Sequence, residues 1–240
     1  NPLFPVLAGR LTIATSNSQN QDIAVAGRYA YVVDSQSDDL KIIDVSNPAS
    51  PVQVSSLGLT AFTTIPRVKV QGRYAYVTEF TNGNLYTIDI SNPAAPIIRS
   101  TFSIGSGGPG PLDFAVSGRY AYVNDRANTL LKVVDISNPA TPALVGSVTV
   151  TSAPRGLAFS GRFVYLTATT NLKIVDVSNP AAPVVATTTA LGTVTPTDIA
   201  LAGRYLAIVD SGTTDLDLWD VASSTAPSLV GTLPLGTSAA

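Results

Sequence analysis

A tract that recurs five times along the chain constrains the fold more than any other feature of this sequence. The dipeptide Gly-Arg precedes a strand-like run at five places, spaced by 45, 46, 43 and 42 residues: Gly27, Gly72, Gly118, Gly161 and Gly203. About 17 residues after each glycine comes an aspartate followed by an aliphatic residue: Asp44, Asp89, Asp135, Asp176 and Asp220. The first four aspartates open the tract Asp-(Val/Ile)-Ser-Asn-Pro, and the fifth copy keeps the length but not the letters, as terminal repeats do. A fixed period of this size indicates a repeat architecture.

Each repeat resolves into four short strands, which we call a, b, c and d. In the fourth repeat they are expected at residues 156–160, 163–167, 172–176 and 184–189, separated by turns rich in Gly, Asn and Pro. The strands are rich in Val, Ile, Thr and Tyr, whereas helix has little support because the chain contains one Glu and 17 Pro. Four short strands every 42–46 residues is the period of a propeller blade. The sequence therefore predicts an all-β fold, a β-propeller of five four-stranded antiparallel blades.

The whole chain, residues 1–240, is expected to form a single propeller domain. Its blade units are 22–66, 67–111, 112–154, 155–196 and 197–240, preceded by an N-terminal closing strand in residues 1–21. This additional strand-d copy is indicated by residues 1–5, which match residues 47–51 at the start of the first strand d. We expect it to close a ring of five blades by pairing with strand c of the last blade, residues 216–220, because closure removes sheet edges.

The last blade also has its own strand d at residues 228–232, so one of the two strand-d copies is surplus. The surplus strand could lie as an additional outer strand, remain unpaired, or add to a sheet of another molecule. Alternatively, the repeats are part of a longer propeller that an association completes.

There are five arginines in the Gly-Arg turns, as many as there are aspartates at the ends of the c strands. They are Arg28, Arg73, Arg119, Arg162 and Arg204. We expect one structural pair in each blade, which would fix the ab turn against the cd corner: Arg28 with Asp44, Arg73 with Asp89, Arg119 with Asp135, Arg162 with Asp176 and Arg204 with Asp220. The alternative is that each aspartate caps its own Ser-Asn-Pro turn. Both interpretations assign these ten residues to the fold.

The strand c tracts resemble the core of the LVIVD repeat. The matching segments read Leu40-Lys-Ile-Ile-Asp44, Leu131-Lys-Val-Val-Asp135 and Leu172-Lys-Ile-Val-Asp176, and the Gly-Arg-Tyr-Ala-Tyr-Val and Ser-Asn-Pro-Ala-x-Pro tracts on either side are similar to the same repeat. The resemblance covers nearly the whole chain. It implies a β-propeller from a family of mostly secreted or surface-attached bacterial and archaeal proteins, and hence an extracellular or cell-surface location. Residues 1–20 do not read as a signal peptide.

A candidate ligand site lies where strand a of each blade begins. Five positions before each turn glycine the residues are Asp22, Arg67, Asp113, Gly156 and Asp198, with Arg155 next to Gly156. Because strand a lines the channel of a propeller, these side chains should surround one mouth of it. They could form a polar funnel for a small ligand, a cation or a peptide end. The alternative is mutual salt bridging together with capping at the first residue of each strand.

Composition removes several function classes. The chain has no Cys and no His, which excludes disulfides, thiolate nucleophiles, imidazole ligands and Ser-His triads. A net charge of −2 argues against a nucleic-acid partner, and no apolar run approaches the roughly 18 residues that a membrane helix needs. We expect no metal and no cofactor. The acidic clusters of the bc turns, Asp34 with Asp38 and Asp39, and Asp210 with Asp215 and Asp217, are interpreted as solvated turn carboxylates rather than a Ca²⁺ site.

The recurrence leaves almost no reactive residue unexplained, so we expect a non-catalytic scaffold or binding module and not an enzyme. Its partner would be a protein or a glycan. One alternative is a glycoside hydrolase, for which Asp22, Asp113 and Asp198 are the candidate acid, base and nucleophile. Another is a self-assembling homo-oligomer in which the surplus strand d bridges neighbours.

Overall fold

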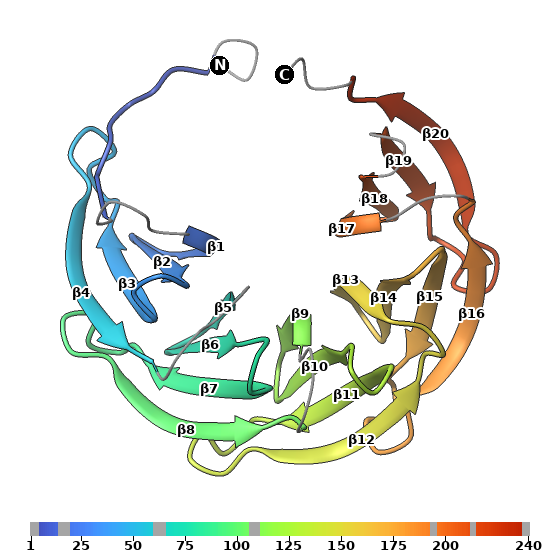
Figure 1. Ribbon diagram of the computed structural model, residues 1–240, viewed down its shortest axis with the longest axis horizontal. Helices are drawn as coiled ribbons and strands as arrows, with labels where there is room; N and C mark the ends of the chain where they lie inside the picture. Colours follow the sequence, from blue (N-terminus) through green and yellow to red (C-terminus); the bar gives the residue numbers. More distant parts are fainter. Residues whose placement is uncertain are drawn as a thin grey trace.

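The computed structural model describes residues 5–13, 20–59, 66–105, 111–192, 196–211 and 215–236. Within these ranges it contains 20 strands in five four-stranded sheets and no helix, so none of the described segments is a helix able to span a membrane. The sheets stand side by side around an arc, with the first strand of each innermost and the fourth outermost (Figure 1). The all-β propeller predicted from the repeat is confirmed.

Each repeat forms one antiparallel sheet, which we number as blades 1 to 5. Blade 1 contains β1 (Asn20–Ala26), β2 (Tyr29–Asp34), β3 (Asp39–Asp44) and β4 (Val52–Gly58). Blade 2 contains β5 (Arg67–Gln71), β6 (Tyr74–Thr78), β7 (Asn84–Asp89) and β8 (Ile97–Ser103). Blade 3 contains β9 (Pro111–Ser117), β10 (Tyr120–Asp125), β11 (Leu130–Asp135) and β12 (Ala143–Thr149). Blade 4 contains β13 (Pro154–Ser160), β14 (Phe163–Ala168), β15 (Asn171–Asp176) and β16 (Val184–Ala190). Blade 5 contains β17 (Pro196–Ala202), β18 (Tyr205–Asp210), β19 (Asp215–Asp220) and β20 (Ser228–Pro234).

The Gly-Arg dipeptide forms the two-residue turn between strands a and b in every blade. All five glycines adopt positive φ values between +57° and +61°: Gly27, Gly72, Gly118, Gly161 and Gly203. A tight hairpin needs this left-handed conformation at its first turn position, and glycine adopts it without the penalty that a Cβ imposes. The five glycines are therefore structurally equivalent, as the repeat requires.

The core lies between blades rather than inside any one of them. Tyr31 and Ile42 of blade 1 pack against Val68, Val77 and Ile88 of blade 2, and all five side chains are buried. Similar clusters join blades 2 and 3, blades 3 and 4, and blades 4 and 5. Strands b and c are therefore apolar on both faces, because each face packs on a different neighbour.

The expectation of a closed ring of five blades is wrong. Figure 1 shows an opening between the first and last blades. Side chains on both walls of this opening are exposed, among them Ile23 of β1 and Leu218 of β19. The N-terminal residues 5–13 are not in a strand and do not pair with β19, whose partner on that side is β20. Of this segment, residues 11 and 13 pack against blade 1, and residues 1–4 of the predicted strand-d copy lie outside the described residues.

This packing predicts unequal effects at two equivalent leucines. Leu40 is fully buried between blades 1 and 2, whereas Leu216 occupies the same position on the open face of blade 5 and is half-buried. Leu40→Ala should lower the free energy of unfolding by about 2–5 kcal/mol, and Leu216→Ala by clearly less, because little cavity forms where no neighbour packs. Urea denaturation of the two variants measures both values. Equal losses would contradict a core that depends on neighbouring blades.

Candidate functional site at the channel mouth

The starts of four neighbouring a strands surround one small cavity. It has a volume of about 170 Å³ and is lined by Arg67 of β5, Asp113 of β9, Arg126 after β10, Arg155 and Gly156 of β13, and Thr197 and Asp198 of β17. Four of the five predicted site residues therefore lie together. Asp22 belongs to the same series on β1, but it does not line this cavity.

Asp113 is the most deeply placed carboxylate of the site, and both of its oxygens accept backbone hydrogen bonds. The amide of Phe114 donates to Oδ1 and that of Leu157, on the next blade, donates to Oδ2, each at 2.8 Å. The Nζ of Lys69 stands 3.9 Å from Oδ1. Burial disfavours the charged form and raises the pKa of Asp113 to about 6, although Lys69 and the two amides oppose this shift.

Asp22 makes the same contacts between blades 1 and 2 that Asp113 makes between blades 3 and 4. Its Oδ1 accepts the amide of Ile23 at 2.9 Å and its Oδ2 accepts the amide of Val68, on blade 2, at 3.0 Å. Asp198 accepts the amide of Ile199 through Oδ1 at 2.8 Å. An aspartate at this position therefore caps its own strand and, in blades 1 and 3, connects it to strand a of the next blade. This agrees with the capping interpretation.

The arginines give the cavity its remaining chemistry. Arg67, Arg126 and Arg155 carry three guanidinium groups, against the carboxylates of Asp113 and Asp198. The buried side chain of Asn124 accepts the amide of Asp113 at 2.8 Å and donates to the carbonyl oxygen of Arg155, so it fixes β13 beside β9. Three arginines outnumber two carboxylates in this lining, and the Asp113 carboxylate already accepts two amides, so the cavity suits an anionic group such as a carboxylate.

Sequence reasoning missed Arg126. This residue lies in the bc turn of blade 3, outside the series counted from the turn glycines. The signal available was that the turn residues after Asp34, Asp125 and Asp210 read Ser35, Arg126 and Ser211, so blade 3 alone among them places a cation there.

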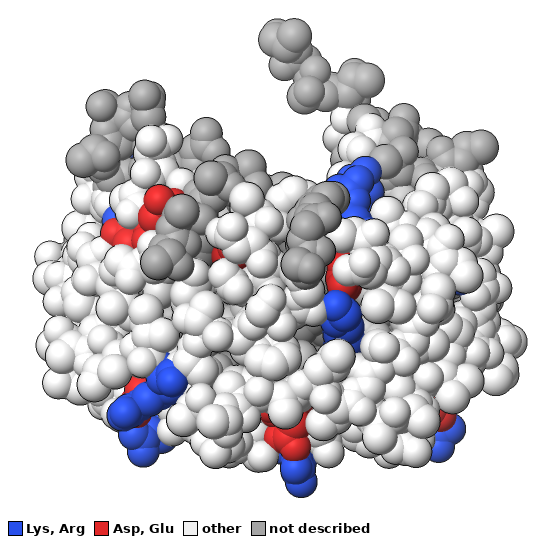
Figure 2. All heavy atoms as spheres, turned by 60° about the horizontal axis from the view of Figure 1, so that its bottom comes forward, with Lys and Arg blue, Asp and Glu red and all other residues white. Residues whose placement is uncertain are grey.

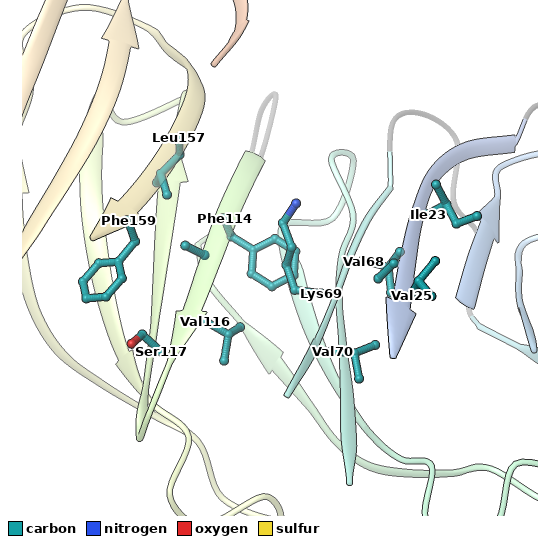
Figure 3. A pocket seen from close by; sticks show the side chains of 12 residues that line it. Ile23, Val25, Val68, Lys69, Val70, Phe114, Val116, Ser117, Leu157 and Phe159 are labelled. Carbon is teal, nitrogen blue, oxygen red and sulfur yellow. The ribbon is translucent and has the colours of Figure 1, made fainter. Parts of the chain in front are cut away.

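A larger cavity of about 460 Å³ follows the channel wall along strands β1, β5, β9 and β13. The side chains that line it are apolar apart from Lys69 and Ser117. Figure 3 shows Leu157 and Phe159 at one side of the cavity and Ile23 and Val25 at the other. Because Lys69 also faces Asp113, the polar mouth and this apolar wall meet at one residue.

The Arg–Asp pairs occupy the opposite rim, where the ab and cd turns meet. All five pairs are present: Arg28 with Asp44, Arg73 with Asp89 (2.6 Å between Nη2 and Oδ2), Arg119 with Asp135, Arg162 with Asp176 (3.0 Å) and Arg204 with Asp220. Each guanidinium also stacks over the aromatic ring that follows it, at 4.9–5.4 Å. Charged side chains meet in separate pairs at the lower edge of Figure 2.

Each aspartate of these pairs caps its cd turn as well. The Oδ1 of Asp44 accepts the amide of Ser46 at 2.9 Å, and the other four aspartates accept the equivalent amide at 2.9–3.0 Å. The two interpretations offered by the sequence are therefore both present in one geometry. The hydrogen bond from Arg119 lowers the pKa of Asp135 to about 2.

The prediction of solvated carboxylates is wrong for four of the six aspartates in the acidic bc clusters, whereas Asp38 and Asp215 are partly exposed. Asp34 and Asp39 are buried and both pair with Lys41, whose Nζ lies 2.9 Å and 2.6 Å from them. In the second cluster Asp210 and Asp217 are also buried. In blade 1 the carboxylates therefore neutralise a buried lysine instead of facing solvent. The described residues contain no group of three carboxylates placed to hold a metal ion.

These features define the class of protein: an all-β propeller whose blades are joined by apolar faces and whose charges are sorted to two rims. The LVIVD repeat matches residues 19–57, 66–103, 112–150 and 154–189, and the chain belongs to the LVIVD-repeat family. No curated protein matches it.

Solved structures resemble it in fold. The periplasmic gluconolactonase of Pseudomonas aeruginosa superposes with a TM-score of 0.77 at 14% identity, over 90% of this chain and 70% of that one. A putative 6-phosphogluconolactonase from Bacteroides fragilis gives 0.73 at 11%, over 88% and 69%. The β-propeller domain of Cps50 (Swd1) from Myceliophteria thermophila gives 0.69 at 12%, over 91% and 74%. Each of these chains is longer than the part that the five blades match.

The raised pKa of Asp113 has a consequence for stability. The folded chain holds this proton up to about pH 6, whereas the unfolded chain releases it near pH 3.8, so stability from this group is gained as the pH falls from 7 to 5. The loss of unfolding free energy caused by Asp113→Ala should be larger at pH 5 than at pH 7 by about 1 kcal/mol. Urea denaturation at both values measures it, and a carboxyl ¹³C titration with a midpoint near pH 4 would contradict it.

The exposed Arg–Asp pairs should contribute little through charge alone. Arg119→Gln and Asp135→Asn should each lower the Tm by less than about 2 °C, because the guanidinium is solvated. Asp135→Ala should lower it by about 2–4 °C, because the amide of Ser137 also loses its acceptor. Thermal unfolding at low salt and at high salt separates the two effects. If Asp135→Asn is as harmful as Asp135→Ala, the cap does not matter.

Proposed function

We propose that this protein is a non-catalytic binding module of the cell exterior or cell surface, and that its channel mouth binds a carboxylate carried by a protein or glycan partner. The observation that carries the proposal is the arrangement of acidic and basic side chains at the mouth. Both oxygens of the Asp113 carboxylate accept a backbone amide, and Arg67, Arg126 and Arg155 line the same cavity. A planar guanidinium binds a carboxylate through paired hydrogen bonds, and three around 170 Å³ suit one such group.

The same contacts argue against a catalytic pair of carboxylates. A general acid, base or nucleophile needs an oxygen that the substrate can reach. The oxygens of Asp22 and Asp113 accept amides that belong to the sheet framework, and only Asp198 of the three is exposed. Membership of the LVIVD-repeat family and the absence of Cys are compatible with a place outside the cell. One propeller of similar fold is a periplasmic protein.

The second candidate is an enzyme that acts on a sugar derivative, either a glycoside or a lactone. It is favoured by the pKa of Asp113, since a carboxyl group with a pKa near 6 at a cavity wall is the usual form of a general acid. Two of the solved structures of similar fold are described as lactonases, at 14% and 11% identity.

Binding assays can separate these two functions. Acidic oligosaccharides and peptides with a free C-terminus are tested against carboxyl-reduced and amidated counterparts. We expect binding that requires the carboxylate and that falls at least about 10-fold in Arg126→Gln/Arg155→Gln. Arg119→Gln, on the opposite rim, is the matched control and should bind normally.

Turnover is tested in parallel on glycosides and sugar lactones. Hydrolysis that disappears in Asp113→Asn would establish the enzyme and overturn the binding module. Binding that is equally strong without the carboxylate would also overturn the proposed ligand.

A further inference from the structure

The outward face of blade 5 has the composition of a buried face. Val209 and Leu218 are 38% and 36% exposed, whereas the equivalent residues of blade 1, Val33 and Ile42, are both 0% exposed beneath blade 2. Tyr205 lies on the same face and is also exposed. β20 is exposed at every residue, while the outer strands of the other blades alternate or are partly covered. This face matches the inner surface of a blade–blade contact and has no blade against it.

Two residues of β20 and its continuation are shaped for a neighbour that follows. The eighth residue after the last proline of each cd corner is buried in blades 1 to 4, at 0–7% exposure: Leu59, Ile104, Val150 and Leu191. In blade 5 that residue is Leu235, at 53%. Four residues before it, Gly231 has nothing within 4 Å of an added Cβ. At the equivalent Gly146 a Cβ would stand 2.2 Å from the carbonyl oxygen of Pro180 in the next blade.

The aspartate at the mouth continues this pattern. Asp22 and Asp113 each accept an amide from strand a of the following blade. Asp198 holds the same position in blade 5, is exposed, and accepts the amide of its own neighbour Ile199. A strand a placed beyond β17 would present the corresponding second amide to it.

Residues 5–13 show the same relationship from the other side of the opening. A Cβ at Gly9 would meet the carbonyl oxygen of Pro48 at 2.2 Å, the distance found between Gly146 and Pro180. Leu11 and Ile13 pack on the buried face of blade 1 formed by Ala30, Val32 and Ile43. This segment therefore sits on blade 1 as β12 sits on blade 4, in the place of strand d of a preceding blade. Nearer the channel, Ile23 of β1 is 59% exposed.

We propose that the opening between blades 5 and 1 is a docking site for further blades of the same repeat type. The first of them packs on β17–β20, with its cd corner against Gly231 and its strand a on Asp198. The last contributes strands a, b and c only and takes residues 5–13 as its outermost strand. The solved propellers of similar fold agree with this reading, because 26–31% of their length has no counterpart in these five blades.

The number of strands argues against a second copy of the chain as the occupant. If blade 5 of one copy packed on blade 1 of another, β20 of the first and residues 5–13 of the second would compete for one strand-d position. A unit that supplies strands a to c leaves no strand over. The walls on both sides are apolar, as the faces of such a blade are.

The test extends the chain with its own repeat. Residues 1–235 are followed by a copy of residues 151–182, or by copies of residues 151–191 and 151–182 in tandem, so that one or two blades are added. We expect monomers in light scattering, a Tm raised by about 5 °C or more, and weaker binding of a hydrophobic dye. In the extension that closes the ring, deletion of residues 1–13 should remove the part of the gain that comes from closure.

Gly231→Val is the matched control. It should leave the Tm of the original chain unchanged, because a side chain there meets nothing, and should lower that of both extended chains. Equal effects in all three chains would overturn docking on blade 5, as would extensions with no gain in Tm. A gain that never depends on residues 1–13 would overturn the role of that segment. An original chain that forms stable dimers through Leu218, lost in Leu218→Asp, would overturn the proposal in favour of a second copy.

Discussion

Each sheet of this protein is apolar on both faces, and only another sheet of the same kind can cover it. Hydrophobic burial between blades is the interaction on which the rest depends, because no blade has an interior of its own. The glycine turns, the Arg–Asp pairs and the aspartates at the strand starts all act on top of this stacking. They set where each strand begins and ends, and so they keep equivalent residues of successive blades in register.

Charge is sorted by position in the blade. At the rim of the ab and cd turns, every guanidinium is used by an aspartate and an aromatic ring of its own repeat. At the other rim the repeat is broken. Arg67 replaces the aspartate of blades 1, 3 and 5, Arg126 replaces the serine of blades 1 and 5, and Arg155 stands where the other blades have no charged residue. Departures from the repeat are therefore the part of the sequence that carries specificity, whereas the conforming residues carry the fold.

The sequence was sufficient for the strands, their order and the Arg–Asp pairs, because a period of 42–46 residues with a fixed internal pattern specifies a blade. Four of the five residues predicted for the site line the cavity, because Asp113 and its equivalents are set by their distance from a turn glycine and Arg155 lies next to one of those equivalents. Closure could not be predicted, because it depends on how far each blade turns from the last and not on any local pattern. Arg126 and the buried pairing of Lys41 with Asp34 depend on how a turn folds back over its own sheet.

In a stacked array of this kind, each blade derives almost all of its stability from its contacts with neighbouring blades. Blades 2, 3 and 4 have two neighbours each, whereas blades 1 and 5 have one, so opening fluctuations should begin at the ends of the arc. One wall of the channel mouth, formed by Thr197 and Asp198, belongs to blade 5. A ligand bound there would contact both blade 5, at the end of the arc, and the blades that have two neighbours. Occupancy of the mouth and order of the terminal blade are thus thermodynamically linked, and each should strengthen the other.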